Sequence, residues 1–495
     1  MKKLNLTLLL FFSFTISFGQ GFYNHQWLLG NFFFIQDPKG RIVFDSASFV
    51  HSVEYRKMPF LGTEATICDA QGNFLMSSNG IWIANATNDT MLNGSGLNPN
   101  GITSNWPFGL PMTNNAMFLP FPGDTNKYLL FHHTGTDDGV GLPATELYFS
   151  KIETNNAIDS VVNKNQIVFS DTLNWGIGAC KHANGRDWWI VMIKHNTSII
   201  YKVLITTNGI YSVSQQNLFT PLAKYTSMQL IFSNDGNKFA YSTYQLGTNN
   251  SSLILFDFDR CNGNFSFIDS FGLTTNQYIW GNSFSSSGKL VYACSSTNIF
   301  QINIDSLTVD TVATYDGFIS PPGQTCCATS FWNMYLAANG KIYITSGSSV
   351  QHIHEMNFPD SVGLACDVQQ HAIDLGSYLH LRAVPNHPNY NLGPVVGSAC
   401  DTLTIGVEEL KHDFKFSISP NPTSDGYIKL VYLLPQNKSG VFEVFNITGQ
   451  LIYQMNLTPW STLQFIKLPE MSSGVYTCVI KSGYERVAKK LVVLK

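Results

Sequence analysis

The sequence predicts an all-β protein: a β-propeller of seven blades, with six as the alternative, followed by a small C-terminal β-sandwich. Three observations predict this fold class. Charged residues make up only 13% of the 495-residue chain and aromatic residues another 13%, a mixture typical of strands joined by Gly- and Asn-rich turns. Amphipathic helical stripes are nearly absent. A strand-and-turn pattern also recurs at a fixed interval through the middle of the chain.

The N-terminus, residues 1–19, has the features of a secretory signal peptide. Lys2 and Lys3 precede an apolar run from Leu4 to Phe18, and small or polar residues follow. A basic start, a short apolar core and a small-residue exit are typical of such peptides. A membrane-spanning helix needs about twenty apolar residues, and no later stretch is apolar enough, so we expect no membrane span.

The repeat consists of an apolar residue, a polar turn with glycine, and an alternating strand. Its turn glycines Gly185, Gly236, Gly288 and Gly340 lie 51 or 52 residues apart. Intervals of about forty to fifty residues that hold several short strands are typical of propeller blades. A single blade leaves both faces apolar, so blades must stack around an axis to bury them. The repeat therefore predicts the propeller.

The predicted propeller occupies residues 20–375. Six clear repeats lie between about Thr63 and Asp374, and the stretch from Trp27 to Phe44 forms a partial seventh that could close the ring. Residues 376–412 are rich in Pro, Asn and Gly, which predicts a linker. We expect this linker to pack back on the propeller through Cys366 or Cys400.

The last segment, residues 413–495, carries several motifs in order. It reads Ser419-Pro420-Asn421-Pro422, then Ser473-Gly474-Val475-Tyr476, and closes on Lys489-Lys490-Leu491-Val492-Val493-Leu494-Lys495. This segment resembles a type A C-terminal sorting domain of the type IX secretion system of certain Gram-negative bacteria. The resemblance implies passage through the periplasm to the outer cell surface or the medium. It also implies two partners, the secretion machinery and its sorting peptidase.

The body resembles a set of uncharacterised exported propellers that carry the same C-terminal signal, and no activity comes with that resemblance. The chain has a net charge of −4, and the last segment carries nine Lys/Arg against five Asp/Glu. The body between Gln20 and His412 has 18 basic and 28 acidic residues, so it is acidic. Affinity for nucleic acid comes largely from Lys and Arg, so we expect no nucleic-acid partner. No GxSxG, HExxH, Walker or GxGxxG motif occurs, so we predict no cofactor and no metal.

Nine cysteines in an exported protein predict disulfides. Cys478 is the only one in the last segment and reads as an apolar strand residue, so we expect it to stay unpaired. The other eight form an even set whose connectivity stays open. Cys326 and Cys327 are adjacent, and we expect each to pair elsewhere or to remain free.

Trp106 and Phe108 are the candidate recognition residues. They lie on a long connection, Asn93–Asn115, that is rich in Gly, Asn and Pro. Connections of that length without secondary structure are usually functional or disordered. These aromatic residues either plug the propeller surface or stack on a sugar or a partner chain.

The weak candidates for metal binding or acid–base chemistry are His132, Asp137, His352 and His354. Adjacent residues on a strand point to opposite faces, so we expect one of His132 and His133 to point inward and the other to be exposed. His352 and His354 would share a face and could hold zinc only with a third ligand from elsewhere.

Two hypotheses for function remain. The first is a secreted or cell-surface binding protein whose propeller presents loops to an unknown glycan or protein. The alternative is a propeller hydrolase or lyase that acts on polysaccharide or peptide. An enzyme should bring ionisable groups with shifted pKa values from different blades to one end of the channel. A binding protein should show aromatics and few convergent charges there.

Overall fold

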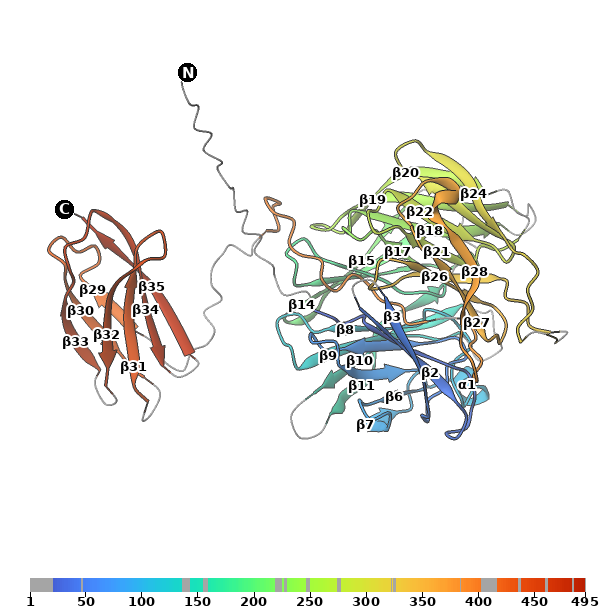
Figure 1. The fold of residues 1–495 in the computed structure, drawn as a ribbon, viewed down its shortest axis with the longest axis horizontal. Helices are drawn as coiled ribbons and strands as arrows, with labels where there is room; N and C mark the ends of the chain where they lie inside the picture. The colour runs from blue at the N-terminus through green and yellow to red at the C-terminus, as the bar shows by residue number, and fades with distance from the viewer. Residues whose placement is uncertain are drawn as a thin grey trace, which may run out of the picture. The chain divides into compact units, whose positions relative to one another are not determined.

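The computed structural model describes residues 21–45, 48–135, 143–154, 159–218, 225–226, 229–245, 250–273, 277–321, 323, 326–382, 384–401, 416–434, 438–458, 462–482 and 485–494. The chain forms two compact units, Met1–Thr402 and Leu403–Lys495. We call them the body and the tail domain and describe each by itself. Both are built almost entirely from antiparallel strands (Figure 1), which confirms the all-β prediction.

The body consists of sheets that follow one another in chain order, shown by the change from blue to orange in Figure 1. The N-terminal sheet contains β1 (Gln26–Leu29), β2 (Lys39–Phe44) and β3 (Phe49–Glu54). The next is an eight-stranded sheet made of two four-stranded meanders. The first meander contains β4 (Ala65–Cys68), β5 (Phe74–Ser78), β6 (Trp82–Ala84) and β7 (Thr90–Ser95). The second contains β8 (Ala116–Pro120), β9 (Lys127–His132), β10 (Ala144–Glu153) and β11 (Ser160–Leu173). A parallel pairing of Ser160 with Leu92 joins them.

Four more sheets complete the body. The first contains β12 (Gly178–Lys181), β13 (Trp188–Ile193), β14 (Ile199–Thr206) and β15 (Gly209–Asn217). The second contains β16 (Tyr225–Thr226), β17 (Ile231–Phe232), β18 (Lys238–Gln245), β19 (Asn250–Asp259) and β20 (Asn264–Leu273). The third contains β21 (Gly281–Phe284), β22 (Leu290–Cys294), β23 (Asn298–Asn303) and β24 (Thr308–Thr314). The last contains β25 (Phe331–Leu336), β26 (Ile342–Ser346), β27 (His352–Met356) and β28 (Val368–Asp374).

The repeat glycines of the sequence mark the same turn in successive sheets. The turn lies between β12 and β13, β17 and β18, β21 and β22, and β25 and β26. Its glycines have positive φ values: Gly185 +71°, Gly236 +72°, Gly288 +70° and Gly340 +79°. Each glycine N–H donates to the carbonyl three residues earlier, at 2.8–3.0 Å. Glycine takes positive φ without steric cost, so the repeated residue and the repeated turn have one cause.

Apolar clusters join each sheet to the next and the last sheet to the first. Phe239 and Phe256 pack with Trp189 of the preceding sheet, for example. Trp27 and Ile42 of the N-terminal sheet pack with side chains of β25–β28. The segment after β28 completes this contact, because Asn31 N–H donates to Leu379 O at 3.1 Å and the Gly30 N–H to His380 Nδ1 at 3.4 Å.

Two short helices interrupt the strands within the described residues. Helix α1 (Gly101–Asn105) lies in the connection that the sequence predicted to be irregular, and the Asn100 side chain accepts from Thr103 N–H at 3.1 Å to cap it. The prediction was therefore wrong for the five residues of α1, where an N-terminal Asn cap stabilises a single turn. It was also wrong for Asn93–Ser95, which end β7. The 3-10 helix η1 (Gly363–Cys366) precedes β28.

The tail domain contains two sheets that pack face to face. One contains β29 (Phe416–Ser419), β30 (Tyr427–Tyr432) and β33 (Leu463–Lys467). The other contains β31 (Gly440–Phe445), β32 (Leu451–Leu457), β34 (Gly474–Ser482) and β35 (Glu485–Val493). Side chains from both sheets, such as Leu430 and Phe442, form one core in which Cys478 is buried and unpaired.

Replacing the turn glycine Gly185 by Ala should lower the free energy of unfolding of the body by about 2 kcal/mol or more. The added Cβ would lie 2.6 Å from Pro394 N, a backbone atom that cannot rotate away. Gly209→Ala is the matched control, since Gly209 also has positive φ (+93°) but a Cβ there meets nothing within 4 Å. Urea denaturation should show the larger loss for Gly185→Ala, and equal losses would contradict the proposed contact.

Candidate functional site

Two sets of residues lie along the first strands β4, β8, β12, β17, β21 and β25. Residues at or near the starts of these strands are linked to each other. Ile177 N–H donates to Asn114 O at 3.1 Å, and Asn333 Nδ2 donates to Trp280 O at 2.7 Å. We call this set the start end. Residues of β8, β12, β17, β21 and β25, with Gln229 and Leu230 just before β17, line a cavity, and we call that set the cavity end.

The cavity has a volume of 360 Å³. Its lining comes from the first strands of several sheets, from the N-terminal residues before β1 and from the segment after β28. The polar side chains in the lining are Asn24, His25, Gln229, Ser233, Asn234, Asn282, Ser283, Ser286, Tyr335, Asn386, His387, Asn389 and Asn391. None of the described lining residues is Asp, Glu, Lys or Arg. The cavity is therefore polar without a carboxylate or a permanent cation.

Gln229 holds three strands of the cavity wall together. Its Oε1 accepts from Asn282 N–H at 3.0 Å and from Met334 N–H at 3.2 Å, while its Nε2 donates to Met334 O at 2.9 Å. A buried amide with its hydrogen bonds made stiffens the wall that it belongs to. No local pattern pointed to Gln229, because it lies just before a two-residue strand and belongs to no motif.

Burial keeps the two cavity histidines neutral. Burial lowers the pKa of His387 to about 4, although a hydrogen bond to the Thr66 carbonyl at 2.8 Å favours the charged form. Burial also lowers the pKa of His25, whose Nδ1 lies 3.1 Å from Phe44 O. At neutral pH the cavity thus offers uncharged donors and acceptors.

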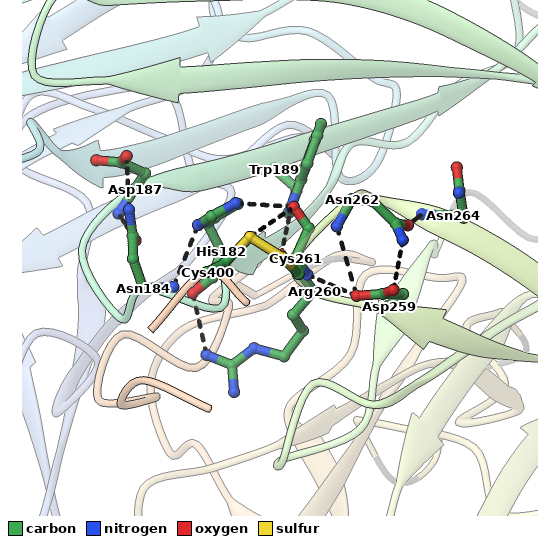
Figure 2. Close-up of a disulfide and its surroundings, with 10 residues drawn as sticks. All are labelled: His182, Asn184, Asp187, Trp189, Asp259, Arg260, Cys261, Asn262, Asn264 and Cys400. Carbon is green, nitrogen blue, oxygen red and sulfur yellow. Dashed lines mark hydrogen bonds between the residues drawn. A yellow bond between two sulfur atoms is a disulfide. The ribbon is translucent and has the colours of Figure 1, made fainter. Parts of the chain in front are cut away.

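The segment of residues 384–401 contributes Pro385–Asn389 and Asn391 to the cavity lining. It is fastened to the body by a disulfide, which Figure 2 shows with its surroundings. The Cys261–Cys400 disulfide joins it to the β19–β20 turn. Arg260 Nη2 donates to Gly393 O at 2.6 Å, and Val395 N–H donates to Ala183 O at 2.8 Å. Covalent and polar attachments together fix the side of the cavity that this segment forms.

The two disulfides test the predictions made for four of the cysteines. Cys400 was one of the two cysteines expected to bind the segment to the body, and it does so, whereas Cys366 is free and buried. The expectation for the adjacent pair was wrong, because Cys326 and Cys327 pair with each other. Their Cα atoms are 3.7 Å apart, and Cys327 has a φ of +76° in the turn that brings the two sulfurs together.

The start end contains buried polar atoms without a hydrogen-bond partner among the described residues. They come from the eight-stranded sheet with its connections, from the β25–β28 sheet and from the segment after β28. They are Glu64 Oε1 and Oε2, Asn114 Nδ2, Asn115 Nδ2, His133 Nδ1 and Nε2, Thr134 Oγ1, Trp332 Nε1, Asn333 Oδ1, Ser346 Oγ and Arg382 Nε. Buried polar groups in native proteins are nearly always satisfied by protein or by ordered water, so we expect water or a ligand to contact these groups.

Glu64 is the buried acid of the start end. Burial raises the pKa of its carboxyl well above the usual range, against the opposing effect of Arg56 nearby. Tyr335, whose pKa is raised chiefly by burial, lies near this carboxyl, and its hydroxyl donates to Asn114 Oδ1 at 2.9 Å. Tyr335 also lines the cavity, so this acid lies close to both ends of the first strands.

Half-buried aromatic side chains surround these polar groups. The indoles of Trp280 and Trp332 stack at 3.8 Å with an interplanar angle of 15°. Trp106 packs against the cluster around Leu110. Phe108 is 44% exposed and stacks on Phe33 at 4.6 Å. Of the two predicted recognition residues, Trp106 is therefore partly buried against the Leu110 cluster, and Phe108 remains accessible to solvent.

His132 and His133 are both fully buried, so the expectation that one would be exposed was wrong. His132 lies between Asn98 Oδ1 at 2.9 Å and Ser150 Oγ at 3.0 Å, where it fastens the loop to the sheet. His133 follows the strand and faces the start end, where its backbone N–H donates to Asn115 O. Both faces of this strand are covered, which the local sequence could not show. Asp137 lies outside the described residues.

His352 and His354 both contact the connection between β24 and β25. His352 Nδ1 lies 2.7 Å from Ser320 Oγ, and His354 Nε2 lies 2.6 Å from Thr329 O. Among the residues that the structure describes, no three His, Cys, Asp or Glu side chains come together as metal ligands would. These two histidines are thus placed as packing residues of the last sheet.

Sequence comparison identifies the tail. Residues 417–494 match the family model of the secretion system C-terminal sorting domain. The tail is a type IX secretion sorting domain. The protein is therefore exported to the cell surface or beyond it, and its sorting domain interacts with the type IX machinery. In the described part of the chain, no helix is long and apolar enough to cross a membrane.

No curated protein matches the sequence. Several solved structures are similar to the chain at low sequence identity. They include a functionally unknown protein from Desulfotomaculum acetoxidans (12% identity, 73% of this chain, 99% of that one, TM-score 0.39). Another is the extracellular domain of a hybrid two-component system from B. thetaiotaomicron (10%, 96% and 56%, TM-score 0.39). A third is an oligogalacturonate lyase from Vibrio parahaemolyticus (7%, 65% and 88%, TM-score 0.35). At these TM-scores we draw no conclusion from their functions.

Proposed function

We propose that the body is an exported binding protein that holds a neutral saccharide in the cavity. The observation that carries this proposal is the cavity lining, which combines many amides and hydroxyls with no described carboxylate or permanent cation. Its volume of 360 Å³ falls in the range of about 300–1,000 Å³ that is usual for small-ligand sites. An uncharged ligand rich in hydroxyl groups matches these donors and acceptors.

The proposed architecture is a seven-bladed β-propeller. Six blades correspond to the meanders that begin with β4, β8, β12, β17, β21 and β25. The seventh contains β1, β2 and β3, and the segment around Leu379 supplies its inner edge. The hydrogen bonds from Gly30 and Asn31 to this segment support that arrangement, as do the apolar cores shared by successive sheets.

The proposed path of export starts with removal of residues 1–19. The tail domain then directs passage across the outer membrane, where the sorting peptidase cleaves within or near the linker, residues 376–412. Because residues 384–401 are bound to the body by the Cys261–Cys400 disulfide, we place the cleavage after Cys400. The body is then released or attached to the cell surface.

A second candidate function is a hydrolase or lyase of saccharides. One observation favours it: Glu64 and His133 come from neighbouring meanders, and both have shifted pKa values. Burial lowers the pKa of His133 to about 3 and raises that of Glu64. A carboxyl that keeps its proton can act as a general acid.

Filling the cavity should abolish saccharide binding. Ala338 lines the cavity, and Ala338→Trp should weaken binding of the best neutral oligosaccharide at least about tenfold, because a bulky side chain excludes the ligand. Ala86→Trp, on an exposed turn away from the lining, is the matched control and should bind normally. Calorimetry with oligosaccharides of glucose, galactose, mannose and xylose provides the measurement. Absence of binding to the wild type, or unchanged binding to Ala338→Trp, would refute the proposal. Cleavage of the bound sugar would favour the second candidate.

A further inference from the structure

Arg382 is a half-buried cation that forms no ion pair with a carboxylate in the described part of the chain. Burial is the cause of its lowered pKa, and no described carboxylate forms an ion pair with it. Its Nη1 donates to Pro111 O at 2.7 Å, while its Nε is buried and has no partner. A guanidinium that is partly shielded from water gains stability by pairing with an anion. Arg382 is therefore a candidate to bind an anion from outside.

The backbone of Arg382 is strained to hold the guanidinium in this place. Its φ is +67°, a left-handed conformation that costs a non-glycine residue about 1 kcal/mol or more and is concentrated at binding and catalytic sites. Its N–H donates to Ser346 O at 2.9 Å, and its Cζ lies 5.7 Å from the centre of the Trp332 ring. Backbone and indole thus fix the cation at the start end.

Two more donors without partners lie beside this cation. Trp332 Nε1 and Ser346 Oγ are buried and unpaired. They occupy adjacent strands, since Phe331 pairs with Ser346 in the β25–β26 ladder. Gly347 makes room for the indole, because a Cβ there would lie 2.5 Å from Trp332 Cε3. Arg382 Nε–H, the indole N–H and the serine hydroxyl form a set of donors that suits a carboxylate.

The aromatic surroundings indicate what carries the carboxylate. Trp332 stacks on the half-buried Trp280, and Pro111, the partner of Arg382, belongs to the same connection as Trp106 and Phe108. Half-exposed indoles offer an apolar face to a pyranose ring together with a polar N–H. We propose that the start end is a second site, which binds a uronic acid residue of an acidic glycan through Arg382, Trp332 and Ser346.

This site differs in position and chemistry from the cavity. The described cavity lining has no charged residue and does not include Arg382, Trp332 or Ser346. The inference therefore does not depend on saccharide binding in the cavity. Absence of binding at one site does not imply absence of binding at the other. The probes distinguish the two sites because only the probe for the start end carries a charge.

The test uses the full chain and calorimetry with digalacturonic acid, with its methyl ester as the uncharged match. The wild type should bind the acid at least about tenfold more tightly than the ester, because a charge-assisted hydrogen bond contributes about 1.5–3 kcal/mol. Trp332→Phe keeps the ring stack but removes the N–H, and Ser346→Ala removes the hydroxyl. Each should weaken binding of the acid several-fold and leave binding of the ester unchanged, and Arg382→Lys should weaken it about tenfold.

Arg186→Ala is the control for loss of a guanidinium, because Arg186 forms an ion pair with Asp187 on the β12–β13 turn and should not matter. Thermal denaturation of each variant shows that it is folded. Equal affinity of the wild type for acid and ester would overturn the proposal, as would normal binding by both Trp332→Phe and Ser346→Ala. Binding of an acidic peptide but not of digalacturonic acid would likewise overturn it in favour of a protein partner.

Discussion

Removal of Leu403–Lys495 should stop export, and the truncated protein should accumulate in the periplasm. The division into body and tail domain places this cut between two compact units, and the deleted part contains the complete sorting domain. The shortened body retains its sheets and the Cys261–Cys400 disulfide, so it should still fold. Immunoblots of medium, cell surface and periplasm provide the measurement, with surface and medium expected at background level.

The complementary experiment attaches Leu403–Lys495 to an unrelated periplasmic reporter. The reporter should then appear at the surface or in the medium, because the tail domain has its own core and needs no contact with the body. Truncated protein outside the cell at the wild-type level would show that the body carries an export signal of its own, contrary to the assignment.

Acidification should destabilise the body strongly between pH 6.5 and pH 4. His132, His133 and His354 are fully buried, and burial lowers their pKa values to about 3, about 3 and about 4. Below pH 6.5 the unfolded chain takes up protons that the folded body excludes, so stability falls as pH falls. At pH 5 each histidine should cost about 2 kcal/mol, so together they approach the whole stability of about 5–15 kcal/mol that is typical of a domain.

Urea denaturation of the body at pH 7.5 and pH 5 measures this loss. His133→Asn should reduce it by about 2 kcal/mol, because His133 has no side-chain partner to lose. His132→Asn is the comparison: it breaks contacts with Asn98 and Ser150 and should lower stability at both pH values. Glu64 acts in the opposite direction, since its raised pKa favours the folded body as the pH falls toward 4.5. An identical acid loss in wild type and His133→Asn would contradict the assignment.

The candidate site could be predicted only in part. The connection that carries Trp106 and Phe108 was singled out by its length and composition, and it does adjoin the start end through Pro111. Glu64, Trp332 and Arg382 gave no local signal. Each stands outside any motif, and its importance comes from neighbours that are distant in the chain. Comparing the position just before the first strand of every repeat could have drawn attention to Glu64.

The histidine candidates also show that the local sequence predicts a functional site only in part. His132 and His354 attracted notice as reactive residue types, and both turned out to be bonded within the packed body. Their roles depend on Asn98, Ser150 and Thr329, which approach only after the sheets assemble. Residue type by itself therefore gave candidates, and packing decided which of them have free ring nitrogens.

The sequence by itself determined the export route and the all-β class. The motifs of the sorting domain are contiguous, and the turn glycines such as Gly236 impose their conformation locally through positive φ. Only the tertiary structure decided which cysteines pair, which polar groups are left without partners and where the cavity lies. Those properties arise from contacts between sheets far apart in the chain, as between Cys261 and Cys400 or between Pro111 and Arg382. Burial then changes the chemistry of the groups brought together, and no local pattern encodes burial.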